Sequence, residues 1–313
     1  MMLGLIAALV MAQGPAPRDG YVTTSDSARI YYRIAGHGAD TIIAIHGGPG
    51  MDMETIYADF TPLEARHVVI FYDQRGGGHS DLPADTTKLF YARQIQDLDE
   101  LRLHFKLKQV TLLAHSYGPL LAGSYALAHP EAVKRMVFFG PVPPMLYDSL
   151  HRAFWDRYSA EFRARTDSAD NAGMRAASML RRSADTAAQR KGCRDYWKIA
   201  VKPRLADPDR IDVVKSDLCG SDLNGIRYGG ATGNRVIMGS YGEWDLRARL
   251  KTLQVPLLVV HGERETIPMD MVAYWVSSMP HAELFKVPRA AHFTYAEQPQ
   301  VVWPKVEQFL SGR

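Results

Sequence analysis

A single serine stands between an apolar run and a helix-forming segment. Residues 110–115 (VTLLAH) are typical of a buried strand, Ser116 follows, and a helical segment begins near Pro119. A serine on so sharp a turn has a strained backbone, so the residues two positions before and after it must be small. They are Ala114 and Gly118. The pattern predicts a nucleophile elbow that presents the Ser116 hydroxyl for attack on an acyl carbon.

Two later loops carry the partners that such a serine needs. A serine hydroxyl requires a base to remove its proton and an acid to orient that base. After a strand–turn–helix serine, the chain order is carboxylate and then histidine. The apolar run 256–261 leads into an acidic loop, and the run 282–287 leads into a loop with a histidine. We predict Ser116 as the nucleophile, His292 as the general base and Glu265 as the orienting acid.

Two neighbouring carboxylates, Glu263 and Asp270, compete with Glu265 for the role of acid. Glu265 is preferred because it lies three residues after Gly262, where this type of loop usually carries an aspartate. The preceding strand, predicted at 133–139, ends without a carboxylate and offers no alternative acid.

A glycine loop supplies the second half of the predicted chemistry. The apolar run 41–46 opens into the sequence HGGPG at 46–50. Glycines let backbone amides approach the carbonyl oxygen that becomes negative in the transition state. The amides of Gly48 and Tyr117 are therefore the predicted oxyanion-hole donors.

Apolar runs typical of strands alternate with segments of helical periodicity, and this alternation predicts the fold that holds these loops. Short runs at 21–24 and 29–35 predict an opening antiparallel pair, and helical spacing occurs at 91–105 and 269–278. The alternation predicts an α/β protein: a mostly parallel, eight-stranded sheet with helices on both faces and its site at the carboxyl ends of the strands. The remaining strands are predicted at 41–46, 67–72, 110–115, 133–139, 256–261 and 282–287.

Four motifs in this order resemble the α/β-hydrolase superfamily, and more narrowly its proline iminopeptidase branch. They are HGGPG at 46–50, FYDQRGGGHS at 71–80, the elbow at Ser116 and the loop containing His292. The resemblance implies the α/β-hydrolase fold with an inserted helical cap. It also implies a serine peptidase that acts through an acyl-enzyme and removes N-terminal residues from small peptides or amides. Asp73 and Arg75 would then brace the loop around the oxyanion hole.

The chain divides into three predicted parts. Residues 1–20 are an export signal and tail, residues 21–140 and 246–313 form the hydrolase core, and residues 141–245, where the strand pattern stops, form the helical cap. In an iminopeptidase the cap holds the substrate's free amine with carboxylates, because a buried ammonium needs paired negative charge. The candidates are Glu243, Asp156 and Glu161, although the tryptophan–glutamate signature of such caps is not clearly present.

The sequence leaves more than one activity and more than one localisation open. The leading function is an aminopeptidase, the runner-up is an esterase or lactonase of small acyl substrates, and a non-catalytic binder on the same scaffold is the third. The apolar stretch 1–12 ends in Val10-Met-Ala12 and predicts cleavage after Ala12 with export to the periplasm or medium, against a cytoplasmic alternative. If the protein is exported, Cys193 and Cys219 are a candidate disulfide; otherwise they are two buried thiols.

Charge and motif content indicate which classes of partner to expect. A net charge of +3 over 313 residues, without a basic run interleaved with aromatics, predicts no nucleic-acid partner. No phosphate loop, dinucleotide fingerprint or zinc spacing occurs, so no cofactor and no metal are expected. The N-terminal apolar stretch is too short to span a bilayer, so no stable membrane association is expected. The predicted partner is a small molecule or short peptide, and the oligomeric state is left open.

Overall fold

The computed structural model describes residues 16–220 and 233–312. The predicted signal peptide therefore lies outside the described residues. The first strand, β1, already begins at Arg18, although the core was expected to start at residue 21. None of the helices in these two described ranges is both long and apolar enough to cross a membrane.

Eight strands form one sheet in the order β1-β2-β4-β3-β5-β6-β9-β10. The pairs β1–β2 and β2–β4 are antiparallel, and all other neighbours in this sheet are parallel. The prediction of a mostly parallel, eight-stranded sheet is confirmed. The strands are β1 (Arg18–Thr23), β2 (Arg29–Gly36), β3 (Asp40–Ile45), β4 (His67–Tyr72), β5 (Val110–His115), β6 (Val133–Phe139), β9 (Leu257–Gly262) and β10 (Ala282–Val287).

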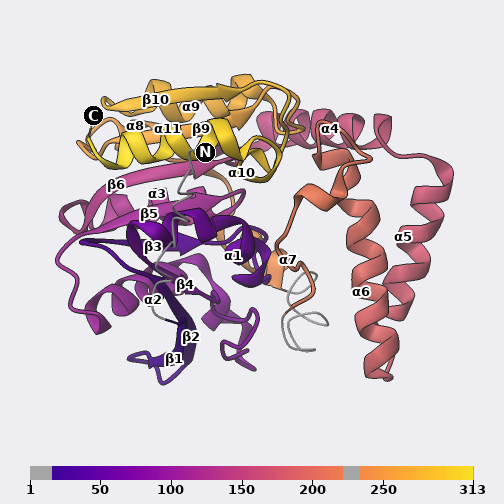
Figure 1. Ribbon diagram of the computed structural model, residues 1–313, viewed down its shortest axis with the longest axis horizontal. Helices are drawn as coiled ribbons and strands as arrows, with labels where there is room; N and C mark the ends of the chain where they lie inside the picture. The colour runs from indigo at the N-terminus through magenta and orange to yellow at the C-terminus, as the bar shows by residue number, and fades with distance from the viewer. Residues whose placement is uncertain (1–15, 221–232, 313) are drawn as a thin grey trace, which may run out of the picture.

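Side chains that alternate along the central strands build two separate cores. In β3, Ile43 faces one core and Ile42 faces the other, and both are fully buried. This alternation follows from the two-residue period of a strand, and it explains why both faces need helices. Figure 1 shows helices on both sides of the sheet. One core contains side chains of α2 (Tyr91–His104), α3 (Gly118–Ala128) and α9 (Met269–Ser278), and the other those of α1 (Glu54–Phe60) and α11 (Pro299–Leu310).

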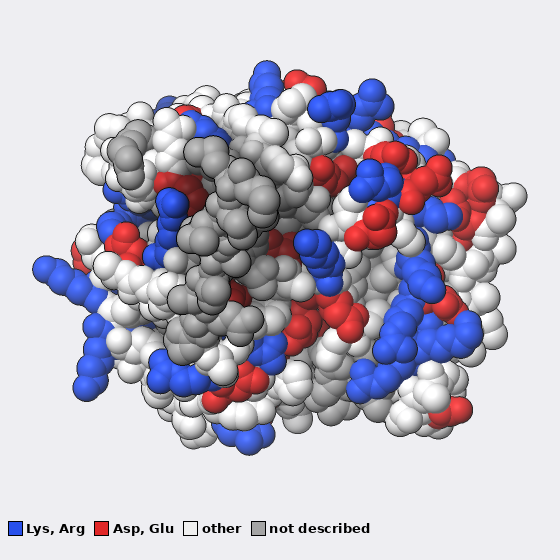
Figure 2. Space-filling view, viewed as in Figure 1, with Lys and Arg blue, Asp and Glu red and all other residues white. Residues whose placement is uncertain are grey.

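A helical segment is inserted between β6 and β9, and residues 141–245 are called the inserted segment below. Its helices α5 and α6 pack against each other, and Figure 1 shows them at one end of the molecule, away from the sheet. Figure 2 shows Lys and Arg side chains gathered on this side, with Asp and Glu beside them. The helices are α4 (Asp148–Ala164), α5 (Ser168–Leu180), α6 (Thr186–Ala200) and α7 (Asn234–Tyr241), followed by α8 (Arg247–Leu250).

Two strands that the sequence did not predict join the ends of the inserted segment. Strand β7 (Met145–Leu146) pairs antiparallel with β8 (Trp244–Asp245). Each has only two residues, which is too short for a two-residue period to be recognised. The pairing fixes both ends of the inserted segment beside the sheet.

The sulfur atoms of Cys193 and Cys219 are bonded, joining α6 to a loop 26 residues further along the chain. The double change Cys193→Ala and Cys219→Ala should lower the free energy of unfolding by about 3 kcal/mol, because the bond restricts the unfolded chain. Denaturant unfolding with and without reductant measures this, and the reduced wild type should match the variant. Titration of two free thiols in unreduced, denatured protein would contradict the prediction.

Candidate active site

The turn after β5 holds Ser116 in a strained conformation. Its φ is +61°, in the left-handed region that a residue with a side chain rarely adopts. The backbone N–H of Ser116 donates to the carbonyl oxygen of Phe139 at 2.9 Å, and its carbonyl oxygen accepts from the N–H of Val142 at 2.9 Å. The chain that leaves β6 therefore fixes the serine turn, as expected for a nucleophile elbow.

His292 and Glu265 form a hydrogen-bonded pair at the same edge of the sheet. Nδ1 of His292 lies 2.8 Å from Oε2 of Glu265, and because an ionised carboxylate only accepts, Nδ1 is the donor. The side chain of Glu265 is fully buried. Burial raises the pKa of this carboxyl group, but the charge and hydrogen bond of His292 outweigh it and hold the pKa at about 2. Glu265 is thus ionised at neutral pH.

Residues Phe139 and Gly140 connect the serine turn to this pair. Gly140 has a φ of +50°, and a Cβ atom there would lie 3.0 Å from Nδ1 of His292 and 3.1 Å from Oε2 of Glu265. On the other side, the ring of His115, the residue before the serine, lies 4.6 Å from the ring of His292 between centroids. The structure therefore gathers Ser116, His292 and Glu265 around the end of β6.

The competing carboxylates are engaged elsewhere or exposed. Asp270 forms a two-fold hydrogen-bonded ion pair with Arg157, both contacts being 2.9 Å long. Glu263 is exposed to solvent. Of the three acids considered for this loop, Glu265 is the one that contacts His292.

The glycine loop after β3 lies against the serine turn. A Cβ atom on Gly47 would lie 2.7 Å from Cβ of Ser116, so only glycine permits this approach. Gly48 has a φ of +53° and accepts a turn hydrogen bond from the N–H of Met51 at 2.8 Å. Among residues 16–220 and 233–312, no backbone group accepts a hydrogen bond from the N–H of Gly48 or of Tyr117. Their role as oxyanion-hole donors stays a prediction.

Asp73 and His46 hold the glycine loop in place. Asp73 is fully buried and accepts from the N–H of Met53 at 2.9 Å and of His79 at 2.8 Å. Nε2 of His46 accepts from the N–H of Gln74 at 3.1 Å, and burial lowers the pKa of this imidazole, which keeps it neutral. These contacts agree with the bracing role that the resemblance implied for Asp73.

Arg75 is buried in the same turn and does not face the serine. Its guanidinium group donates to Asp97 at 2.8 Å and to Asp26 at 2.8 Å. Asp97 belongs to α2, and Asp26 follows β1, so the arginine ties the turn after β4 to both elements. The ion pair is nearly inaccessible to solvent, and its role is structural.

The three carboxylates proposed as amine anchors are exposed. Asp156 and Glu161 lie on the solvent side of α4, and Glu161 pairs with Arg165 at 3.3 Å. Glu243 is exposed just before β8. The structure does not assemble these three into a buried negative site, because the apolar face of α4 carries Phe154 instead. Their role as substrate anchors stays a prediction.

One residue that contacts the histidine loop was not assigned a role from the sequence. Glu297 follows His292 by five residues and accepts hydrogen bonds from the amides on both sides of it. In the sequence, its only mark is its position five residues after His292 and two before Pro299. Among the described residues, no group of three or more His, Cys, Asp or Glu side chains is arranged to hold a metal ion.

Comparison with known proteins agrees with the observed fold. The pattern of the family described as the alpha/beta hydrolase fold matches residues 40–299. A proline iminopeptidase of Heyndrickxia coagulans is 23% identical over 94% of this chain and 99% of its own length. The crystal structure of proline iminopeptidase from Mycobacterium smegmatis superimposes with a TM-score of 0.70 at 21% identity, covering 94% of this chain and 98% of that one. A thermophilic esterase from Thermogutta terrifontis gives 0.64 at 20% identity, over 94% and 98%.

Proposed function

This chain belongs to the α/β-hydrolase fold family, and from that premise we propose that it is a serine hydrolase that works through an acyl-enzyme. The observation that carries the proposal is the 2.8 Å bond between His292 and an ionised, buried Glu265, beside a serine held at a φ of +61°. A base oriented in this way next to a strained serine is the arrangement that nucleophilic acyl transfer requires.

The proposed mechanism has two halves. Oγ of Ser116 attacks the carbonyl carbon while Nε2 of His292 takes the hydroxyl proton, and the ionised Glu265 stabilises the imidazolium that forms. The N–H groups of Gly48 and Tyr117 bind the oxyanion, each worth about 3 kcal/mol or more of barrier. His292 then gives its proton to the leaving amine or alcohol. Water, deprotonated by the same imidazole, hydrolyses the ester and frees Ser116.

Within this class we propose an aminopeptidase that acts on short peptides or amides, in the manner of the iminopeptidases it is similar to. The full-length alignment with the Heyndrickxia coagulans protein supports this choice. The exposure of Asp156, Glu161 and Glu243 instead favours the second candidate, an esterase or lactonase with an uncharged acyl pocket. An amine pocket would need another source of buried negative charge.

Two assays test the proposal. A fluorophosphonate probe should label the wild type at Ser116; labelling should be lost in Ser116→Ala and kept in Ser124→Ala, a serine in α3. If the wild type is not labelled, the protein is a non-catalytic binder on a hydrolase scaffold.

Chromogenic prolyl and alanyl amides, with free and acetyl-capped amines, then distinguish an aminopeptidase from an esterase. We expect free prolyl amides to be hydrolysed and capped ones rejected, whereas equal turnover of capped substrates and simple esters would indicate an esterase.

We also propose that the protein is exported. Disulfides persist in oxidising compartments and are rare in the reducing cytosol, and Cys193 and Cys219 are joined. The thiol titration described above tests this on protein purified from its natural compartment.

A further inference from the structure

The carboxylate of Glu297 holds the backbone on both sides of His292. Its Oε1 accepts from the N–H of Ala291 at 2.8 Å and of Phe293 at 3.3 Å. Its Oε2 accepts from the N–H of Ala206 at 2.7 Å, which belongs to the inserted segment. Three backbone amides, two of them adjacent to the predicted base, are therefore satisfied by one side chain at the end of α10 (Thr294–Glu297).

The backbone of His292 itself has two further restraints. Its N–H donates to the carbonyl oxygen of Arg204 at 2.9 Å. Its carbonyl oxygen accepts from Nε2 of His115 at 3.2 Å, and burial lowers the pKa of His115 far enough to keep that ring neutral. Residues 204–206 and the histidine loop are thus bonded in both directions, from His292 to Arg204 and from Ala206 to Glu297. A shift of the inserted segment at this point would move the loop that carries His292.

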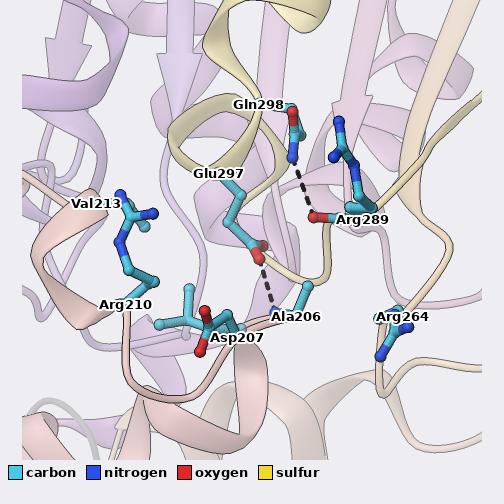
Figure 3. A pocket seen from close by; sticks show the side chains of 9 residues that line it. Ala206, Asp207, Arg210, Val213, Arg264, Arg289, Glu297 and Gln298 are labelled. Carbon is cyan, nitrogen blue, oxygen red and sulfur yellow. Dashed lines mark hydrogen bonds between the residues drawn. The ribbon is translucent and has the colours of Figure 1, made fainter.

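Glu297 forms these bonds although basic side chains stand close by. It lines a pocket of about 430 Å³ together with Arg210, Arg264 and Arg289. Figure 3 shows the carboxylate directed at Ala206, while Gln298 bonds the carbonyl oxygen of Arg289. In the part of the chain that the structure describes, no arginine forms an ion pair with Glu297. Instead, its two oxygens accept from three backbone amides. Burial raises the pKa of this carboxyl group.

We propose that Glu297 is a positioning residue that fixes His292 for catalysis and couples its loop to residues 204–206 of the inserted segment. The proposal rests on the proposed serine hydrolase function. Glu297 acts only through the backbone of the loop. Displacement of a catalytic group by about 1 Å costs on the order of 100-fold in rate. The loss of all three bonds should therefore appear in kcat, whereas substrate affinity should change little.

Three variants test the role. Glu297→Ala removes all acceptors and should lower kcat about 100-fold with KM changed less than about twofold. Glu297→Gln keeps one acceptor oxygen, either for Ala206 or for the amides beside His292. Its kcat should therefore be about tenfold higher than that of Glu297→Ala. Glu64→Gln is the matched control, because burial raises the pKa of both the Glu64 and the Glu297 carboxyl groups. Glu64 lies in a different part of the fold, between α1 and β4. The Glu64→Gln variant should retain wild-type rates.

The rate of fluorophosphonate labelling separates this proposal from the proposed function. If the wild type is not labelled at Ser116, the function itself fails. If the wild type is labelled and a folded Glu297→Ala reacts at the same rate with the same kcat, the positioning role is overturned. Equal losses in the Gln and Ala variants, or a change in KM alone, would also overturn it.

A second variant covers the case in which Glu297→Ala does not fold. Ala206→Pro removes one N–H donor and leaves the carboxylate intact, and Leu205 already has φ −107° and ψ 149°, which suits a residue before proline. We expect kcat to fall about fivefold with KM unchanged, because the loop loses its tie to the inserted segment. Wild-type kcat in Ala206→Pro would overturn the coupling.

Discussion

Ser116→Ala and His292→Ala are each expected to lower kcat roughly 10⁶-fold, and the double variant should be no slower than either single one. The reason is that nucleophile and base act as one unit: without the hydroxyl no acyl-enzyme forms, and without the imidazole the hydroxyl keeps its proton. The residual rate should come from the oxyanion amides of Gly48 and Tyr117, which neither change removes. Steady-state kinetics on the preferred substrate of the panel measure all three variants.

A control histidine distinguishes this from a general effect of losing an imidazole. His281 lies in an exposed position before β10, where Nε2 contacts Oε1 of Gln254 at 3.0 Å. His281→Ala should leave kcat unchanged. Losses that multiply in the Ser116 and His292 double variant would show that the two side chains act independently, and the proposed relay would be wrong.

The buried parallel strands were predictable because nothing in them is exposed. All six residues of β5 are buried, and so are all six of β9, so their sequences are mostly apolar runs bounded by turns. Strand β1 was placed three residues too late, because this edge strand exposes four of its six residues and its polar start carries no apolar signal. Elements of two residues, such as β7 and β8, have no period to detect.

The candidate site could be predicted where chain order and turn chemistry determine it. Ser116 was assigned from the small residues around a strand–helix turn, and Glu265, which contacts His292 in the structure, from its distance to Gly262. The exposure of Asp156, Glu161 and Glu243 could not be predicted, because it depends on how the inserted segment packs. Glu297 was not assigned a role for the same reason. Its partners are backbone amides, and one of them belongs to Ala206, 91 residues earlier in the chain.

The acid of the pair gives the second large effect. Glu265→Gln should lower kcat about 10⁴-fold while the fold is retained. Oε1 of Glu265 already accepts from the N–H of Thr266 at 2.8 Å, from Oγ1 of Thr266 at 3.0 Å and from the N–H of Ile267 at 3.1 Å. In the glutamine variant these donors retain the amide oxygen, so the NH₂ group occupies the position of Oε2 and donates to Nδ1 of His292. The imidazole must then carry its proton on Nε2, the nitrogen that has to accept the serine proton.

The pH dependence of the wild type follows from the same pair. The folded pKa of Glu265, about 2, lies below its ordinary value of 4.5. Its ionisation therefore stabilises the fold above about pH 4.5, and that contribution is lost as the pH falls toward 2. Because Glu265 stays ionised above pH 4, any fall in kcat between neutral pH and pH 4 must come from the protonation of another group. In Glu265→Gln, the free energy of unfolding should no longer show this acid-dependent contribution.

Glu263→Gln is the matched control for this prediction, because the exposed Glu263 stands two residues earlier in the same loop. It should keep wild-type kcat at every pH. The kcat of Glu265→Asp should lie between those of Glu263→Gln and Glu265→Gln. An aspartate can keep the tautomer of His292, but it is one methylene shorter and would lengthen the 2.8 Å bond. If Glu265→Gln retains kcat within tenfold of the wild type, the acid has been assigned to the wrong residue, because a reversed tautomer leaves His292 unable to act as a base.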